Sequence, residues 1–173
     1  ILRLGAAGVG IAHCPSSNMI LSSGIAPVVA MREAGCQVGL GCDGSSSADS
    51  GSLWQEARLA MLQGKLVSGA DQMNARTALE IATRGGAACL GRTGELGELS
   101  PGSVGDIAIW RLEGPQFAGV LDDPIEGWLR CGPLAATHVF VHGNQIVDEG
   151  IFANPQMEEM LSRHRTVAQR FQP

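Results

Sequence analysis

Two side chains that could do chemistry stand directly after apolar segments. Asp43 follows the stretch Cys36–Leu40 within the run Gly-Cys-Asp-Gly, and His13 follows the stretch Gly8–Ile11 and Ala12. A helical pattern lies between the two segments, as in a strand–helix–strand unit. In α/β-barrel enzymes the active site is built where the strands end. We therefore predict that Asp43 and His13 lie at the carboxyl ends of two buried strands.

The chemistry of an Asp in this place is that of a metal ligand and a proton carrier. A divalent ion lowers the pKa of bound water towards about 7, and a neighbouring carboxylate can accept the water proton and later deliver it to a leaving amine. The local tripeptide leaves a structural alternative open, because Asp-Gly after a strand is also a common turn. A lone His after a strand likewise has both a functional and a structural interpretation.

Other polar residues near these positions are weaker candidates. Asn18 is expected to fix its loop, and the role of Ser17 stays open. The loop after Asp43 is expected to be solvated rather than to contact substrate, and the remaining histidines are expected to be structural or superficial. The loop residues are Ser45, Ser46, Ser47 and Asp49, and the histidines are His138, His142 and His164.

The elements that would position Asp43 and His13 can be predicted from periodicity. The apolar content of Cys36–Gly41 without polar alternation predicts a strand buried on both faces, as in a parallel sheet. The helix expected at 75–90 should pack closely against a neighbour, because it carries the small residues Ala78, Ala82, Gly85, Gly86 and Ala87. Helices are expected at 2–7, 24–34, 52–66 and 75–90, with Pro27 in a first turn and Gly35 and Gly91 as stops, and strands at 8–12 and 36–41.

The pattern changes after Gly91. A short strand is expected at 106–110, a hairpin at 137–147 with its turn at Gly143-Asn144, an irregular loop at 113–134 and a last helix at 155–171. The predicted fold class is α/β: the C-terminal part of a TIM-like (β/α)8 barrel, followed by a small β-rich domain. The expected domains are 1–92 for the last barrel strands and helices, 93–150 for part of a composite β-sandwich, and 151–173 for a C-terminal helix.

Composition excludes some partners. The 173 residues carry a net charge of −5, and the 12 Lys and Arg residues form no basic stripe, so a nucleic-acid surface is not expected. No apolar run reaches the roughly 18 residues of a membrane span. The 5 cysteines are scattered, which favours reduced thiols in a cytoplasmic enzyme over a disulfide framework.

Several motifs together resemble one family. They are His-Cys-Pro-Ser-Ser-Asn at 13–18, Ser-Gly-Ile-Ala-Pro at 23–27, Val-Gly-Leu-Gly-Cys-Asp-Gly at 38–44, Ala-Leu-Glu-Ile-Ala-Thr-Arg-Gly-Gly-Ala at 78–87 and Glu-Leu-Ser-Pro-Gly-Ser-Val-Gly-Asp-Ile at 98–107. This combination resembles the amidohydrolase superfamily, in its cytosine/guanine deaminase and chlorotriazine hydrolase-like branch. The resemblance extends from residue 1 to about residue 150.

The resemblance implies roles for both candidate residues. Asp43 matches the family Asp that ends the eighth strand, which is a metal ligand and a proton shuttle. His13 matches a His at the end of the seventh strand, which lines the substrate site. The family's other metal ligands, a His-x-His pair and a further His, have no counterpart in these 173 residues.

The implied activity is hydrolytic deamination of a small nucleobase-like heterocycle, of the 8-oxoguanine, guanine or cytosine type. The implied cofactor is a divalent metal, zinc or else iron, which the chain by itself should bind weakly or not at all. We expect the 173 residues alone to be inactive, and to form a homo-oligomer or to associate through exposed barrel edges. The alternative is a non-catalytic truncated remnant that folds or associates without activity.

Overall fold

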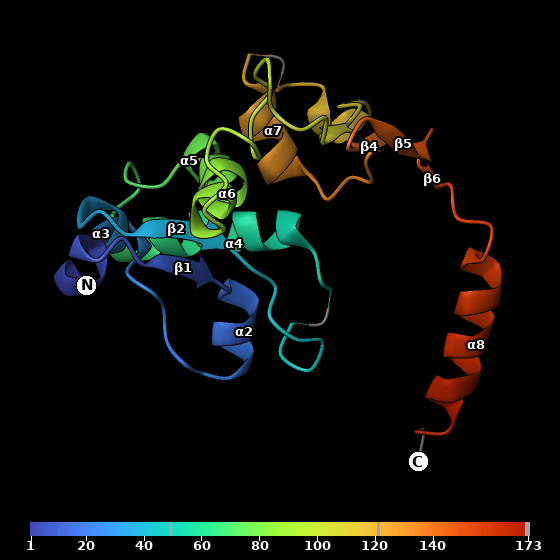
Figure 1. Ribbon diagram of the computed structural model, residues 1–173, viewed down its shortest axis with the longest axis horizontal. Helices are drawn as coiled ribbons and strands as arrows, with labels where there is room; N and C mark the ends of the chain where they lie inside the picture. The colour runs from blue at the N-terminus through green and yellow to red at the C-terminus, as the bar shows by residue number, and fades with distance from the viewer. Residues whose placement is uncertain (49, 121, 172–173) are drawn as a thin grey trace. The chain divides into compact units, whose positions relative to one another are not determined.

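The computed structural model describes residues 1–48, 50–120 and 122–171 (Figure 1). The chain divides into two compact units. Unit 1 consists of Ile1–Val104 and Leu112–Leu134, and unit 2 consists of Gly105–Arg111 and Ala135–Pro173. The domain boundaries expected from the sequence stay predictions.

Unit 1 is built on two parallel strands. β1 (Gly10–His13) pairs with β2 (Gln37–Leu40) in a register that sets His13 opposite Leu40. The parallel arrangement expected from the apolar content of β2 is confirmed, although only Val38 and Gly39 of this strand are fully buried. The connection between the strands contains α2 (Pro15–Ile20) and α3 (Val28–Glu33). α1 (Leu2–Ala6) precedes β1.

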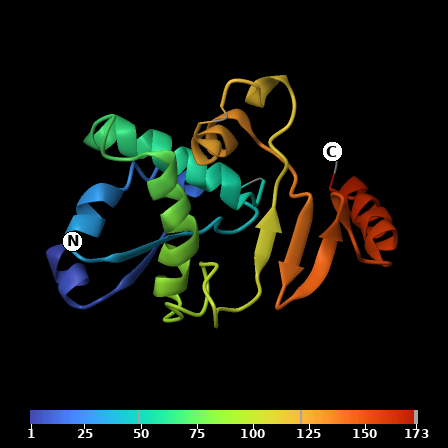
Figure 2. The same cartoon turned by 90° about the horizontal axis from the view of Figure 1, so that it is seen from above.

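A long helical segment packs on β2. It runs without interruption through α5 (Ala75–Glu80), the π-helical turn η1 (Ile81–Gly85) and α6 (Gly86–Cys89), and Figure 2 shows it as one green helix. A Cβ atom added at Gly85 would lie 2.1 Å from the carbonyl oxygen of Val38. Close packing through small residues is therefore confirmed, and the π turn occurs where the helix meets the strand.

The core of unit 1 lies between β2 and helical segments that include α4 (Leu53–Ser68), the segment α5–α6 and α7 (Pro124–Cys131). α4 begins at Ser52, whose hydroxyl accepts a hydrogen bond from the amide of Gln55, and it contributes Met61 to the core. Met61, Met73, Ile81 and Leu129 are the largest fully buried apolar side chains.

Three expectations about unit 1 are wrong. The sequence predicted a loop where α2 forms, and it predicted that the next helix begins at Gly24, whereas α3 begins after Pro27. The expected irregular loop at 113–134 contains the short helix η2 (Pro115–Phe117) and α7 (Pro124–Cys131). Asp123 caps α7 by accepting hydrogen bonds from two backbone amides, and Pro124 occupies the first helical position, so a proline inside the expected loop starts a helix instead.

Unit 2 contains a four-stranded antiparallel sheet. Its strands are β3 (Ile107–Ile109), β4 (His138–Val141), β5 (Asn144–Asp148) and β6 (Ile151–Phe152), in this order. The hairpin expected at 137–147 is confirmed, but its turn lies at His142-Gly143, one residue before the expected pair. Both residues have positive φ, 51° and 77°, as a tight turn that follows the strand twist requires. α8 (Met157–Gln169) follows the sheet, and none of the described helices could span a membrane.

Candidate functional site

The structure brings Asp43 and His13 to the same end of the two-stranded sheet. His13 is the last residue of β1, and Asp43 follows β2 by three positions. The amide of Gly41 donates a hydrogen bond to the His13 carbonyl at 3.0 Å, which continues the strand pairing up to the site. Because the strands are parallel, both side chains stand at carboxyl ends, the position that the sequence predicted.

Two hydroxyl groups hold the carboxylate of Asp43 on one side. Ser17 Oγ donates to Asp43 Oδ2 at 2.6 Å, and Ser47 Oγ donates to the same oxygen at 2.8 Å. These two bonds, with the backbone amide of Gly44, lower the pKa of Asp43 below its ordinary value. The residue is exposed and is therefore ionised at neutral pH, and neither hydroxyl uses its Oδ1 atom.

Asp43 is one of four non-glycine residues in the described chain with a left-handed backbone, with φ of 61°. Asp tolerates this conformation better than most residues do, at a cost of about 1 kcal/mol. This conformation turns the chain after β2, so that Ser47 in the following loop can donate a hydrogen bond to the Asp43 carboxylate. A local backbone strain thus accompanies the orientation of a chemically active group.

His13 is buried and neutral. Only 4% of the residue is exposed, and burial lowers the pKa of its imidazole to about 4. Its Nδ1 atom is buried without a hydrogen-bond partner among the described residues. Buried polar atoms of this kind are rare in folded proteins, so the free nitrogen marks hydrogen-bonding capacity that a ligand or further protein could use.

α2 positions Ser17, and the N-terminus of this helix is held by an acid that lies far away in the sequence. Pro15 occupies the first helical position and Glu56 of α4 accepts a hydrogen bond from the amide of Ser16 at 2.9 Å. The carboxylate therefore fills the role of a capping side chain at an N-terminus whose own cap residue is Cys14. Glu56 is 1% exposed.

Glu56 and Ser47 are the contributors that sequence reasoning missed. Glu56 shares the buried face of α4 with Ala57, Ala60 and Met61, so an acid on an apolar stripe was the available signal. Ser47 was expected in a solvated loop, but it is buried and bonded to Asp43, whereas Ser45 and Ser46 are exposed as expected. Asp49 lies outside the described residues.

The two cysteines beside the site stay protonated. Burial raises the pKa of the Cys14 thiol, and the negative charges of Asp43 and Glu56 raise it further. Burial and then the charge of Glu56 raise the pKa of Cys42 in the same direction. Thiolates, the form that binds zinc, are therefore disfavoured here.

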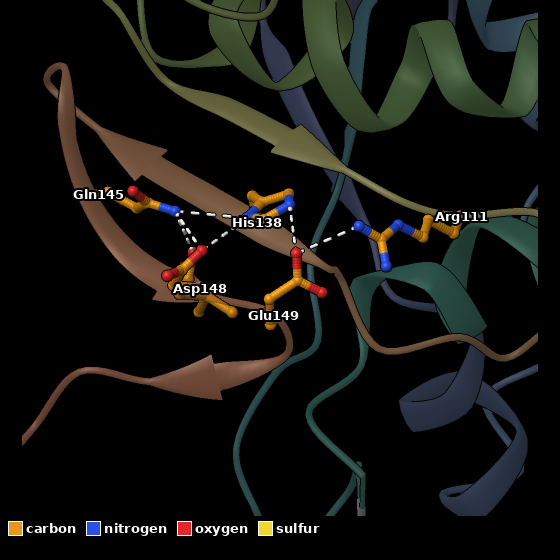
Figure 3. Close-up of polar contacts among 6 residues, drawn as sticks. Arg111, His138, Gln145, Asp148 and Glu149 are labelled. Carbon is orange, nitrogen blue, oxygen red and sulfur yellow. Dashed lines mark hydrogen bonds and ion pairs between the residues drawn. The ribbon is translucent and has the colours of Figure 1, made fainter.

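Asp43 can supply one ligand to a metal ion. Its carboxylate is ionised and fixed, which suits one oxygen ligand of a divalent ion. Among residues 1–48, 50–120 and 122–171, the one set of three closely placed metal-ligating side chains is His138, Asp148 and Glu149 in unit 2. His138 was expected to be merely structural or superficial, and it takes part in this cluster (Figure 3).

Residues 1–152 match the model of the amidohydrolase family, and the chain belongs to this family. It is 43% identical to the 8-oxoguanine deaminase of Pseudomonas aeruginosa over 168 residues, which cover 97% of this chain and 37% of the relative. The structure superposes on a zinc complex of atrazine chlorohydrolase from Arthrobacter aurescens with a TM-score of 0.88 and 35% identity, over 95% of this chain and 37% of the other.

A second solved structure extends the comparison. A zinc-bound adenosine deaminase from Xanthomonas campestris has a TM-score of 0.90 and 26% identity, over 98% of this chain and 39% of the other. The chain therefore spans about two fifths of the length of the relatives it matches. It has a mixed α/β partial amidohydrolase fold with a small antiparallel sheet.

Proposed function

We propose that these residues form the C-terminal portion of a metal-dependent deaminase that hydrolyses an exocyclic amine from a nucleobase-like heterocycle. The observation that carries the proposal is the placement of Asp43 and His13 at adjacent carboxyl ends of parallel strands, with the Asp43 carboxylate held by two hydroxyls. The two strands would be the seventh and eighth of a (β/α)8 barrel. The 8-oxoguanine deaminase similarity, over 97% of the chain, favours an oxidised or amino-substituted purine as substrate, with guanine and cytosine types as the other candidates.

Asp43 would have two tasks in this reaction. A divalent ion, zinc or else iron, supplies a water of lowered pKa and would be held in part by Asp43. Ser17 and Ser47 both engage Oδ2, so Oδ1, which neither hydroxyl binds, would act as ligand or proton acceptor. The lowered pKa of Asp43 keeps this oxygen ionised, and proton transfer by a positioned carboxylate contributes roughly a hundred- to ten-thousand-fold to such reactions.

His13 would contact the substrate rather than a metal ion. Its neutral imidazole can donate a hydrogen bond from one ring nitrogen and accept one at the other. Burial keeps the ring uncharged at neutral pH, which suits an uncharged heterocycle with amide-like edges. The Nδ1 atom is buried and has no hydrogen-bond partner among the described residues, so it retains unused hydrogen-bonding capacity.

A non-catalytic role for the 173 residues is the second candidate. Within the described chain, Asp43 is not part of a set of three metal-ligating side chains, and a catalytic zinc site normally has three protein ligands. We expect the 173-residue chain by itself to be inactive and to hold metal at Asp43 weakly.

Ammonia release separates the two candidates. Full-length protein containing these residues should release ammonia from 8-oxoguanine, guanine, isocytosine or cytosine in a metal-dependent manner. Loss of this activity on chelation, with recovery on zinc or iron, would support the deaminase. No metal-dependent release from any of these compounds would favour the non-catalytic role.

A further inference from the structure

The sheet of unit 2 carries a cluster of charged and metal-ligating side chains that the proposed deaminase reaction does not use. It consists of Arg111, His138, Gln145, Asp148 and Glu149 (Figure 3). His138 lies on β4, Gln145 and Asp148 lie on β5, and Glu149 lies in the turn that follows β5. Each ring nitrogen of His138 faces a different carboxylate.

The backbone explains how two consecutive acids reach one histidine. Successive residues of a strand point to opposite faces of the sheet, so Asp148 and Glu149 would separate if β5 continued. Glu149 instead has φ of 44°, in the left-handed region, and this conformation ends the strand. Both carboxylates thereby face His138.

The two distances at His138 differ in meaning. Nδ1 lies 3.0 Å from Asp148 Oδ1, which is a hydrogen-bond distance. Nε2 lies 3.5 Å from Glu149 Oε1. Two ligand atoms on one tetrahedral zinc ion are about 3.3–3.6 Å apart, because each metal bond measures about 2.0–2.2 Å.

A neutral imidazole cannot satisfy both carboxylates. It carries one N–H group, so a ring that donates from Nδ1 to Asp148 presents the lone pair of Nε2 to a second acceptor, Glu149. Either a second proton on the ring or a cation shared by Nε2 and Glu149 removes this conflict. One ligand atom from each of His138, Asp148 and Glu149 can be chosen so that all lie within 4.8 Å of one another.

We propose that His138 Nε2 and Glu149 bind a divalent transition-metal ion such as Zn²⁺, with Asp148 orienting the imidazole through Nδ1. A carboxylate that accepts from the other nitrogen of a metal-bound His is a common arrangement, and it fixes the ring and its tautomer. The amide nitrogen of Gln145 lies 2.9 Å from Asp148 Oδ1 and 3.3 Å from His138 Nδ1, so with the ring donating from Nδ1 the amide donates to the carboxylate and holds it in turn. Imidazole with carboxylate suits zinc, copper and nickel.

Arg111 is the competitor for this ion. Its Nη2 atom lies 3.1 Å from Glu149 Oε1, so the guanidinium already supplies positive charge to the carboxylate. The ion pair is exposed, and such pairs contribute about 0.2–1 kcal/mol. Removing the guanidinium should therefore strengthen metal binding by up to about fivefold.

The test is a Zn²⁺ titration of the 173-residue chain that carries Asp43→Asn, followed by calorimetry and by ¹⁵N signals of the histidine rings. We expect one equivalent to bind and to shift the His138 ring nitrogens. His138→Ala and Glu149→Gln should abolish this equivalent, and Asp148→Asn should weaken it about tenfold. His164→Ala, on the exposed surface of α8, is the matched control and should bind normally.

Two outcomes would overturn the metal site. The first is that His138→Ala still binds one equivalent of Zn²⁺. The second is that Zn²⁺ does not shift the ¹⁵N signals of the His138 ring, and that these signals show both nitrogens protonated at neutral pH. Circular dichroism of each variant checks that the sheet remains folded. Arg111→Gln should have the opposite effect to the other variants and bind Zn²⁺ more tightly. The inference is independent of the proposed deaminase function, because neither its residues nor its readout involve turnover.

Discussion

The strand-end site of unit 1 and the histidine cluster of unit 2 treat their carboxylates in opposite ways. Asp43 is held by two neutral hydroxyls and keeps its full negative charge, whereas Glu149 is paired with the guanidinium of Arg111. Hydroxyl donors orient a carboxylate without neutralising it. An ion pair orients it as well, but it reduces the charge that a metal or a proton would meet. The difference favours Asp43 as the acid for chemistry, whereas a metal ion at Glu149 has to compete with the guanidinium of Arg111.

The sharpest way to break this comparison is to remove one acid from each region in the full-length protein. Asp43→Asn should lower metal-dependent deamination at least a hundredfold, because it removes a charged ligand and proton carrier. Glu149→Gln should leave turnover within about twofold, as expected for an exposed ion pair. Steady-state ammonia release measures both variants, and equal losses would remove the distinction between the two regions.

A second prediction concerns the packing under the strand-end site. Gly85→Ala should lower the free energy of unfolding by more than about 3 kcal/mol, because the added Cβ would meet the Val38 carbonyl and displace β2. The neighbouring Gly86→Ala is the matched control, since its added Cβ meets nothing within 4 Å. Urea denaturation followed by circular dichroism compares the two. Similar stabilities would show that β2 is not fixed by this contact.

A third prediction uses the buried histidine. The pKa of His13 is lowered to about 4 in the folded chain, so the unfolded chain binds more protons between that value and about 6.5. Its stabilising contribution is thus complete above about pH 6.5 and falls by up to about 1.4 kcal/mol per pH unit as the pH decreases towards 4. Asp43 acts separately, because its lowered pKa affects stability only as the pH falls below its ordinary value near 3.8.

The measurement is chemical denaturation at several pH values from 7 to 4 for the parent chain and for His13→Asn. The variant should lose most of the slope in this interval, whereas His164→Asn, on the exposed surface of α8, should retain it. An identical slope in all three chains would contradict the prediction, because it would mean that the pKa of His13 does not change on folding.

The smallest expected effect belongs to the hydroxyls that hold Asp43. Ser17→Ala should weaken metal binding at the catalytic centre of the full-length protein about tenfold, the ordinary cost of losing a group that orients a ligand. Ser46→Ala is the control, since Ser46 lies in the same loop region as Ser47 and is exposed. Metal affinity by competition with a chelator gives the comparison. No difference between the variants would mean that Ser17 does not position the carboxylate.

The elements that carry regular apolar patterns were predictable from the sequence. The parallel strands, the long helix after Asn74 and the hairpin of unit 2 all follow from local periodicity and turn residues. α2 was missed because it begins at a proline in a segment without an apolar period. α7 was missed although Ile125, Trp128 and Leu129 follow helical spacing, because the prolines of the segment favoured a loop. Their stability comes from Glu56 in one case and from the Asp123 cap with buried Leu129 in the other. The one-residue error at the hairpin turn arose because His142 adopts the left-handed conformation that the sequence assigned to Asn144.

The candidate site was predictable to a similar degree. Asp43 and His13 could be named because each follows an apolar run, and the adjacency of their strands agrees with that expectation. The hydroxyl of Ser17 was not assigned, since a hydrogen bond between segments 26 positions apart leaves no local pattern. Ser47 lies only four positions after Asp43, and its contact depends on the left-handed backbone at Asp43, which the sequence did not predict. The cluster at His138 was missed because the left-handed backbone of Glu149 brings its two acids together.

The bond from Ser16 to Glu56 ties the order of assembly to the site. Glu56 lies 40 positions along the chain from Ser16, so the first turn of α2 gains its acceptor only after α4 has docked. A six-residue helix has little stability of its own in water. The place of Ser17 beside Asp43 therefore depends on the docking of α4, and a change that loosens α4 should also disturb the oxygen environment of Asp43.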